Sequence, residues 1–226
     1  MPLNENHNAG QLATVEIFRT LASVTDTFEG YANPHASRMA AIADQLGKAF
    51  NLGPRDRFSL RIAALAHDLG EAKMGREYIQ RDGPLAEDER IDLARHPIFG
   101  EREAADAGAD RGAQLLVRWH HEWWNGEGYP DGLRFEQIPL GARILRVADA
   151  YTALTDARPF RAALSEKRAR AHLLEWIGLE FDPAVVKVLL LLESFPELTG
   201  YYKDEAPPDF AGIAEDLMDR LDQLGN

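Results

Sequence analysis

The chain has 226 residues, of which 45% are hydrophobic and 27% charged, a mixture typical of one globular domain rather than of a disordered or fibrous protein. Its 25 Lys and Arg residues against 37 Asp and Glu residues give a net charge of −12, which argues against a nucleic-acid polymer as a partner. The absence of cysteine excludes disulfides, a thiolate zinc site and a cysteine nucleophile.

The ends and the apolar runs of the sequence predict a cytoplasmic protein that does not bind membranes. Residues 1–8 contain no basic segment followed by an apolar one, so we expect no signal peptide. The longest apolar run, residues 185–192, is interrupted by Lys187 and is far shorter than the roughly 20 residues that cross a bilayer.

Apolar residues recur with helical spacing along almost the whole chain. Those at positions 12, 15, 18 and 21 predict a short N-terminal helix, and those at 39, 42, 46 and 50 predict a second helix that ends near residues 51–54. Residues 57–69 are apolar on nearly all sides and predict the central buried helix. Further helices are expected over residues 86–95, 97–107, 113–123, 139–155, 165–178 and 183–194. Alternation with period two is nearly absent, so the predicted fold class is all-α.

Proline residues at 196, 207 and 208 set off a C-terminal segment. Its apolar positions 210, 213, 217, 221 and 224 lie opposite acidic positions, which predicts an amphipathic helix. This helix either packs on its own domain or contributes to a dimer contact.

Five of the seven histidines fall at the inner ends of apolar helices. His67 and Asp68 follow the most apolar helix, where burial of an imidazole and a carboxylate is costly unless they pair or bind a metal. His35 shares the apolar face of the second helix, and Asp149 lies inside the helix over residues 139–155. This pattern alone fits either hydrogen-bonded core histidines or the metal centre of a metal-dependent hydrolase.

An ordered set of short motifs narrows these alternatives. The sequence HDLG at residues 67–70 resembles the signature of the HD phosphohydrolase superfamily. It is followed by HPIFG at 96–100, HHE at 120–122, GYPDGL at 128–133, IPLGARI at 138–144, VADAYTALTDARPFR at 147–161 and FDP at 181–183. Over residues 29–195 this succession resembles the HD-GYP family, the bacterial cyclic di-GMP phosphodiesterases.

The resemblance implies an all-α HD-domain helical bundle with additional N- and C-terminal helices. It divides the chain into an N-terminal helical extension over residues 1–28, a catalytic domain over 29–196, and a linker with an amphipathic helix over 197–226. The two terminal helices make a homodimer a possible assembly.

The resemblance also implies a dinuclear metal centre in which His67 and Asp68 are catalytic and Asp68 bridges two divalent ions, usually iron or manganese. The implied ligands are His35, His67, Asp68, His96, His120, His121 and Asp149. Two ions a few Å apart can share a hydroxide that attacks phosphorus while they offset charge on the phosphoryl oxygens. Nitrogen and oxygen ligands suit iron, manganese or zinc without choosing among them.

For the substrate, the resemblance implies hydrolysis of cyclic di-GMP to pGpG, with GMP as a possible further product, in bacterial signalling. Arg158 and Arg161 match positions that grip substrate phosphates, as the forked guanidinium group suits. The loop Gly128-Tyr129-Pro130 is expected to shape the cleft and to contact a cyclase-domain or other signalling protein.

The sequence departs from the family pattern at several positions. Tyr31 stands where some members carry a glutamate ligand of a third metal, which predicts a two-metal site, and Glu29 is expected to be a solvated turn carboxylate. Glu71 replaces a lysine, and Thr152 and Asn125 replace aspartates. Glu71 could add a ligand, repel the substrate or pair with an arginine such as Arg158, and we favour the pairing.

These departures keep two alternatives open. One is an HD phosphohydrolase that acts on another nucleotide. The other is a catalytically weak signalling adaptor that binds cyclic di-GMP, although such an adaptor would not need all seven ligands.

Overall fold

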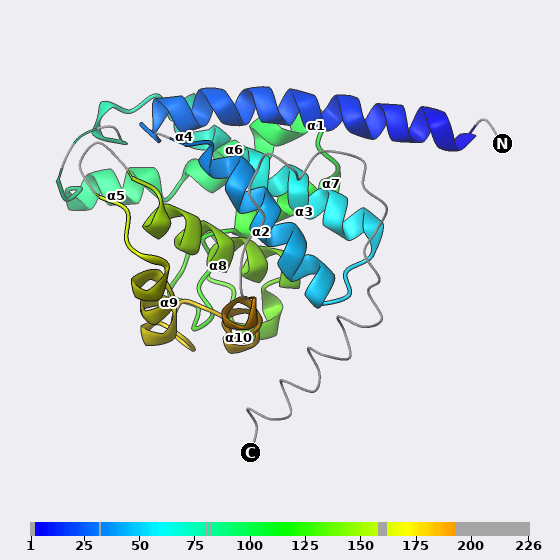
Figure 1. Cartoon of the computed structure of the whole chain (residues 1–226). Coiled ribbons are helices and arrows are strands. Elements are labelled where there is room, and N and C mark those ends of the chain that lie inside the picture. The colour runs from blue at the N-terminus through cyan, green and yellow to red at the C-terminus, as the bar shows by residue number, and fades with distance from the viewer. Residues whose placement is uncertain (1–2, 32, 80, 82, 158–161, 193–226) are drawn as a thin grey trace, which may run out of the picture.

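The computed structural model describes residues 3–192 apart from 32, 80, 82 and 158–161. The described residues form ten α-helices and two short 3₁₀ helices (Figure 1). Their bounds are α1 Leu3–Phe28, α2 His35–Ala49, α3 Pro54–Ala66, α4 Leu69–Met74, η1 Glu77–Ile79, α5 Glu87–Leu93, α6 His96–Asp106, α7 Arg111–Trp119, η2 Phe135–Gln137, α8 Leu140–Thr155, α9 Glu166–Glu175 and α10 Pro183–Leu191. Because the described part of the chain contains one isolated bridge, Ile177 to Phe181, and no strand, the all-α prediction is confirmed.

The core is built around α2, α3 and α8. Helix α2 packs against both α3 and α8, α7 packs against α3 and α6, and α9 and α10 pack against α8. The side chains of Leu60, Leu65, Ile144 and Leu145 are completely or almost completely buried between them. Several helices begin at the residues that favour a start: Pro54 opens α3, and the Asp110, Ser165 and Asp182 side chains cap α7, α9 and α10.

Helix α1 has 26 residues, so the prediction of a short N-terminal helix is wrong. It lies along one side of the bundle, and its N-terminal part extends past the other helices (Figure 1). Val15, Phe18 and Ala22 are buried against the bundle, whereas Leu12, predicted on the same apolar face, is 61% exposed. The predicted amphipathic helix over residues 210–224 lies outside the described residues.

Several helices end earlier than predicted, and two of these early ends matter for the site. The helix predicted over residues 57–69 is interrupted, because α3 ends at Ala66 and Asp68 leaves helical geometry with φ −101° and ψ 13° before α4 begins. The helix predicted over 113–123 ends at Trp119, and the chain turns at His120.

Gly70 allows α4 to lie directly on α6. A Cβ atom at this position would lie 2.0 Å from the backbone oxygen of His96, a distance that no side chain can tolerate. The close approach of the two helices brings Asp68, at the start of α4, beside His96, at the start of α6. None of the helices in the described ranges has the length and apolarity needed to cross a bilayer.

The burial along α1 yields a stability test. Phe18→Ala removes a fully buried ring and is expected to lower the free energy of unfolding by about 3–5 kcal/mol. Ile17→Ala, at a neighbouring position of the same helix that is 51% exposed, is the matched control and should change it by less than about 0.5 kcal/mol. Urea unfolding measures both, and equal values would mean that α1 does not pack on the bundle in solution.

Candidate metal centre

Seven nitrogen- and oxygen-bearing side chains converge at the centre of the bundle from five places in the chain. His35 begins α2, His67 and Asp68 join α3 to α4, His96 begins α6, His120 and His121 follow α7, and Asp149 lies in α8. The side chains form two groups. The ligand atoms of Asp68, His96, His120 and His121 lie within 4.8 Å of one another, and so do those of His35, His67 and Asp149.

Backbone carbonyl groups orient three of the histidines. The Nδ1 atoms of His67, His96 and His120 lie 2.9, 2.9 and 2.6 Å from the carbonyl oxygens of the residues three positions earlier, Ala64, Leu93 and Val117. A carbonyl oxygen only accepts, so each Nδ1 carries the hydrogen and each Nε2 is left to act as a ligand. The Nδ1 atom of His35 similarly faces Asp156 at 3.3 Å.

The ligand atoms that face the centre are better placed to bind a metal ion than to form hydrogen bonds with one another. His35 Nε2, His67 Nε2 and Asp68 Oδ1 are buried without a hydrogen-bond partner. His67 Nε2 lies 2.8 Å from Asp68 Oδ2, but this contact lacks hydrogen-bond geometry. Buried polar atoms without partners are costly, and a bound cation would satisfy all three.

Electrostatics keeps several of these groups in the protonation state that metal binding requires. Burial opposes ionisation of Asp149, but the contact with His35, at 3.5 Å, and the positive charge of Arg146 lower its pKa to about 2. Burial lowers the pKa of His120 and holds that of His121 well below its ordinary value. The carboxylate is therefore ionised and these imidazoles are neutral, as metal ligands must be.

His67 differs from these histidines. Burial opposes its protonation, but the adjacent Asp68 outweighs that effect and raises the pKa of His67 to about 10. The proton supplies a positive partner for the buried carboxylate. A cation bound between them would take over that function and release the proton.

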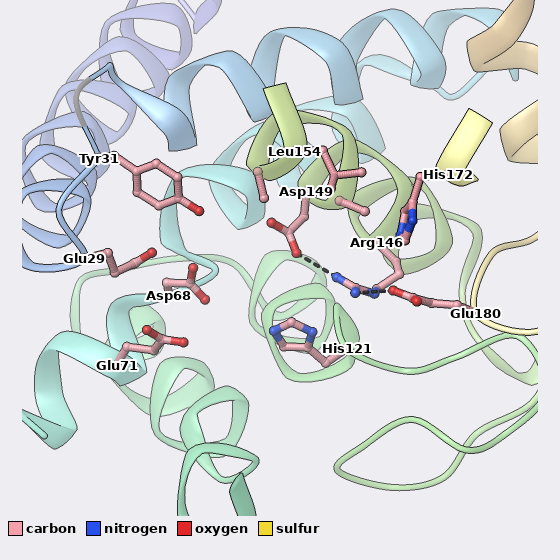
Figure 2. Close-up of a pocket in the computed structure, with 12 residues that line it drawn as sticks. Glu29, Tyr31, Asp68, Glu71, His121, Arg146, Asp149, Leu154, His172 and Glu180 are labelled. Carbon is pink, nitrogen blue, oxygen red and sulfur yellow. Dashed lines mark hydrogen bonds and ion pairs between the residues drawn. The ribbon is translucent and has the colours of Figure 1, made fainter. Parts of the chain in front are cut away.

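A cavity of about 330 Å³ opens beside both groups and includes Asp68, His121 and Asp149 in its lining. One face of α8 supplies much of the wall, because Arg146, Asp149, Ala150, Ala153 and Leu154 follow the helical spacing i, i+3, i+4, i+7 and i+8. Figure 2 shows the carboxylates of Glu29, Asp68 and Glu71 on one side and Arg146 with Glu180 on the other.

The loop that contains Gly128, Tyr129 and Pro130 packs against the metal centre. The Tyr129 ring stacks on the His121 ring with 4.8 Å between centroids, and the Tyr129 backbone N–H donates to the His121 carbonyl. A Cβ at Gly128 would lie 2.2 Å from the Trp123 nitrogen, so only glycine fits. None of these three residues lines the described cavity. The loop instead packs against His121 through the Tyr129 ring.

Glu122, which the sequence analysis quoted only as part of a motif, organises the same loop. Its buried carboxylate accepts hydrogen bonds from the backbone nitrogens of Asp131 and Leu133, at 2.7 and 2.9 Å. It is therefore a structural residue next to the ligand pair His120 and His121.

The turn after α1 folds over the centre and brings two side chains into the lining of the cavity. Tyr31 lines the cavity and stacks on His35, with ring centroids 4.0 Å apart. The expectation that Glu29 is solvated is wrong, because it is only 4% exposed and lines the same cavity. The fold of α1 against α3 and α4, and not the local sequence, carries this carboxylate inward.

Glu71 also lines the cavity. Its carboxylate lies 3.8 Å from His96 Nδ1, and burial, reinforced by Asp68, raises its pKa to about 7. Among the described residues its ion-pair contact is this histidine rather than an arginine. Arg158 and Arg161, the predicted phosphate contacts, lie outside the described residues.

Arg146, His172 and Glu180 also line the cavity, although none of them was predicted from the sequence as a site residue. Arg146 lies three residues before Asp149, so its position on the same face of α8 was a usable signal. Glu180 carried no such signal, because only the fold brings it to Arg146. Thr152 is fully buried and donates to the carbonyl of Ala148, and it does not line the cavity.

Comparison with known proteins agrees with this architecture. The HD domain model matches residues 20–185, and the chain belongs to the HD-domain family. The chain is 35% identical over 179 residues to the cyclic di-GMP phosphodiesterase response regulator RpfG of Xanthomonas campestris, which covers 77% of this chain and 47% of RpfG. It is 30% identical over 180 residues to the 3'3'-cGAMP-specific phosphodiesterase 3 of Vibrio cholerae, which covers 78% of this chain and 39% of that protein.

Two solved structures share the fold. The cyclic GMP-AMP specific phosphodiesterase V-cGAP3 of Vibrio cholerae aligns with a TM-score of 0.62 at 18% identity, over 89% of this chain and 53% of that chain. The HD-GYP-type protein Bd1817 of Bdellovibrio bacteriovorus aligns with a TM-score of 0.59 at 19% identity, over 82% of this chain and 62% of that chain. The matches confirm the resemblance to HD-GYP proteins. The chain spans less than half the length of the two curated relatives named above.

The two ligand groups yield a test of metal binding. Addition of Mn²⁺ to metal-stripped protein is expected to raise Tm by roughly 5–10 °C when the free metal exceeds its Kd about a hundredfold. His35→Ala and His96→Ala, one from each group, should each reduce the metal content measured by mass spectrometry. His172→Ala, a cavity histidine that belongs to neither group, is the control and should retain full content. Equal metal content in all four proteins would contradict the assignment.

Proposed function

We propose that this chain is a metal-dependent phosphodiesterase that hydrolyses cyclic di-GMP to pGpG, with GMP as a possible further product. The observation that carries the proposal is the pair of His and Asp groups that open on one cavity. The curated relatives support it, because they are named as phosphodiesterases of cyclic dinucleotides.

The proposed centre holds two divalent ions, iron or manganese, one at each ligand group. Asp68 is suited to bridge them, because its Oδ1 lies 3.3 Å from His96 Nε2 in one group and its Oδ2 lies 2.8 Å from His67 Nε2 in the other. When bound, such ions activate water for attack on phosphorus and offset charge on the phosphoryl oxygens.

The chain itself positions these elements. His67 and Asp68 are proposed as the catalytic pair, and the other five ligands as His35, His96, His120, His121 and Asp149. Tyr129, stacked on His121, and Tyr31, stacked on His35, limit the movement of one imidazole in each group. Arg158 and Arg161 remain proposed phosphate contacts, and the loop at Gly128-Tyr129-Pro130 remains a proposed surface for a cyclase-domain partner.

A related substrate is the second candidate. The relatives include proteins named for 3'3'-cGAMP as well as for cyclic di-GMP, at similar levels of identity. The cavity carboxylate at Glu71 changes the charge that the substrate meets, which is why both nucleotides belong in the assay.

The proposal is tested by anaerobic incubation of the iron- or manganese-loaded protein with each cyclic dinucleotide, followed by chromatographic separation of the products. We expect pGpG from cyclic di-GMP, and no product from the His67→Ala/Asp68→Ala variant, whose folding is verified by circular dichroism. Intact substrate in the presence of bound metal would contradict phosphodiesterase activity. Binding without turnover would instead indicate a signalling adaptor.

Glu71→Lys tests whether the cavity carboxylate limits the reaction. It places a cation where an anion lines the cavity, and it is expected to raise kcat/KM for the dianionic substrate by about tenfold. Glu77→Lys, the same charge change at an exposed position, is the matched control and should leave kcat/KM unchanged. Equal kcat/KM in the two variants, at equal metal content, would remove Glu71 from substrate binding.

A further inference from the structure

One arginine in the lining of the cavity, Arg146, links two carboxylates. Arg146 Nη1 donates to Asp149 Oδ2 at 2.8 Å, and its Nη2 pairs with Glu180. Figure 2 shows the guanidinium group between these two carboxylates. The side chain is 15% exposed, and its guanidinium carbon lies 5.9 Å from the centre of the Phe181 ring.

The charge around the cavity makes this arginine unusual. Five carboxylates line the cavity, those of Glu29, Asp68, Glu71, Asp149 and Glu180. Arg146 is the one guanidinium group among the described lining residues. A cyclic dinucleotide carries two negative phosphates, so a cavity lined by these carboxylates requires positive charge to receive it.

The two ion pairs hold Arg146 in place but do not engage all of its N–H donors. A guanidinium group has five N–H donors, and the two contacts to Asp149 and Glu180 engage one at each Nη. Because both Nη atoms are held, the plane of the guanidinium group is fixed before an anion binds. Less conformational entropy is therefore lost on binding. Glu180 is itself buried, and of the two carboxylates it is the one that belongs to neither ligand group.

A neighbouring ion pair, Arg143 with Asp182, already provides the structural link that Arg146 and Glu180 could otherwise provide. Arg143, one turn earlier on α8, donates to Asp182 at 2.5 Å and so joins α8 to the start of α10. Arg146 and Glu180 join nearly the same two segments. Only the second pair lines the cavity, so the difference between the two pairs is their access to a ligand.

We propose that Arg146 contacts a phosphate of the cyclic dinucleotide and that Glu180 is a positioning residue that holds the guanidinium group across the cavity. The inference rests on the proposed function and deepens it, because it names a cation of the cavity wall, beside the ligand Asp149, that binds the substrate.

The test uses the metal-loaded full chain with four substitutions: Arg146→Met, Arg146→Lys, Glu180→Gln and the control Arg143→Met. Arg143→Met removes a cation and an ion pair from the same helix but leaves the cavity intact. For each protein, KM and kcat for cyclic di-GMP are measured together with equilibrium dialysis of a hydrolysis-resistant phosphorothioate analogue of cyclic di-GMP, metal content and Tm.

Arg146→Met is expected to raise KM and the dialysis Kd about tenfold or more, as loss of a charge-assisted hydrogen bond does, with metal content unchanged. Arg146→Lys should recover part of the affinity, because it keeps the charge but loses the fork. Glu180→Gln should raise KM by a smaller factor. Arg143→Met should lower Tm while KM stays within about twofold of wild type.

Two results would overturn this inference and leave the proposed function standing. One is an unchanged KM and Kd in Arg146→Met. The other is a loss of activity in that variant that follows loss of metal and is restored by excess metal. The second result would mean that Arg146 acts only through Asp149. If the wild-type protein neither hydrolyses nor binds a cyclic dinucleotide, the proposed function fails and this inference falls with it.

Discussion

The site depends on the burial of one carboxylate, that of Asp68, among imidazole groups. Burial of an ionised carboxylate is prohibitive without compensation, and here His67, His96 and His120 face it from three separate places in the chain. The geometry requires the helix to break at Asp68 and requires α4 to lie against α6, which Gly70 permits. The interruption between α3 and α4 is therefore the feature that brings the ligands of both groups together.

Helix ends supply the second constraint. The last turn of a helix leaves carbonyl groups without an intrahelical partner. Ala64, Leu93 and Val117 lie in the last turns of α3, α5 and α7, and each of their carbonyl oxygens accepts from the Nδ1 of the histidine three residues later. The same hydrogen bond satisfies the helix end and turns Nε2 toward the centre. Backbone carbonyl groups thus orient three of the ligands.

The sequence predicts the helical class and, through the order of its motifs, the residues that converge. It does so because helical periodicity and motif spacing are local properties. Helical periodicity continues through His67 and Asp68, so the break there depends on contacts with α6 and is not visible locally. The burial of Glu29 and the pairing of Arg146 with Glu180, 34 residues apart, are likewise products of tertiary structure.

The charges of the cavity then explain how an acidic protein can receive an anionic substrate. The chain has a net charge of −12, and five carboxylates line the cavity. The cavity therefore repels a dianion unless cations are present. Asp68 and Asp149 belong to the ligand groups and would be offset by bound metal, whereas Glu180 is already offset by Arg146. Glu29 and Glu71 remain, and the raised pKa of Glu71 reduces its negative charge near neutral pH. Binding of the proposed substrate in this cavity would therefore be coupled to metal loading, and Arg146 is the guanidinium group that the described lining residues supply.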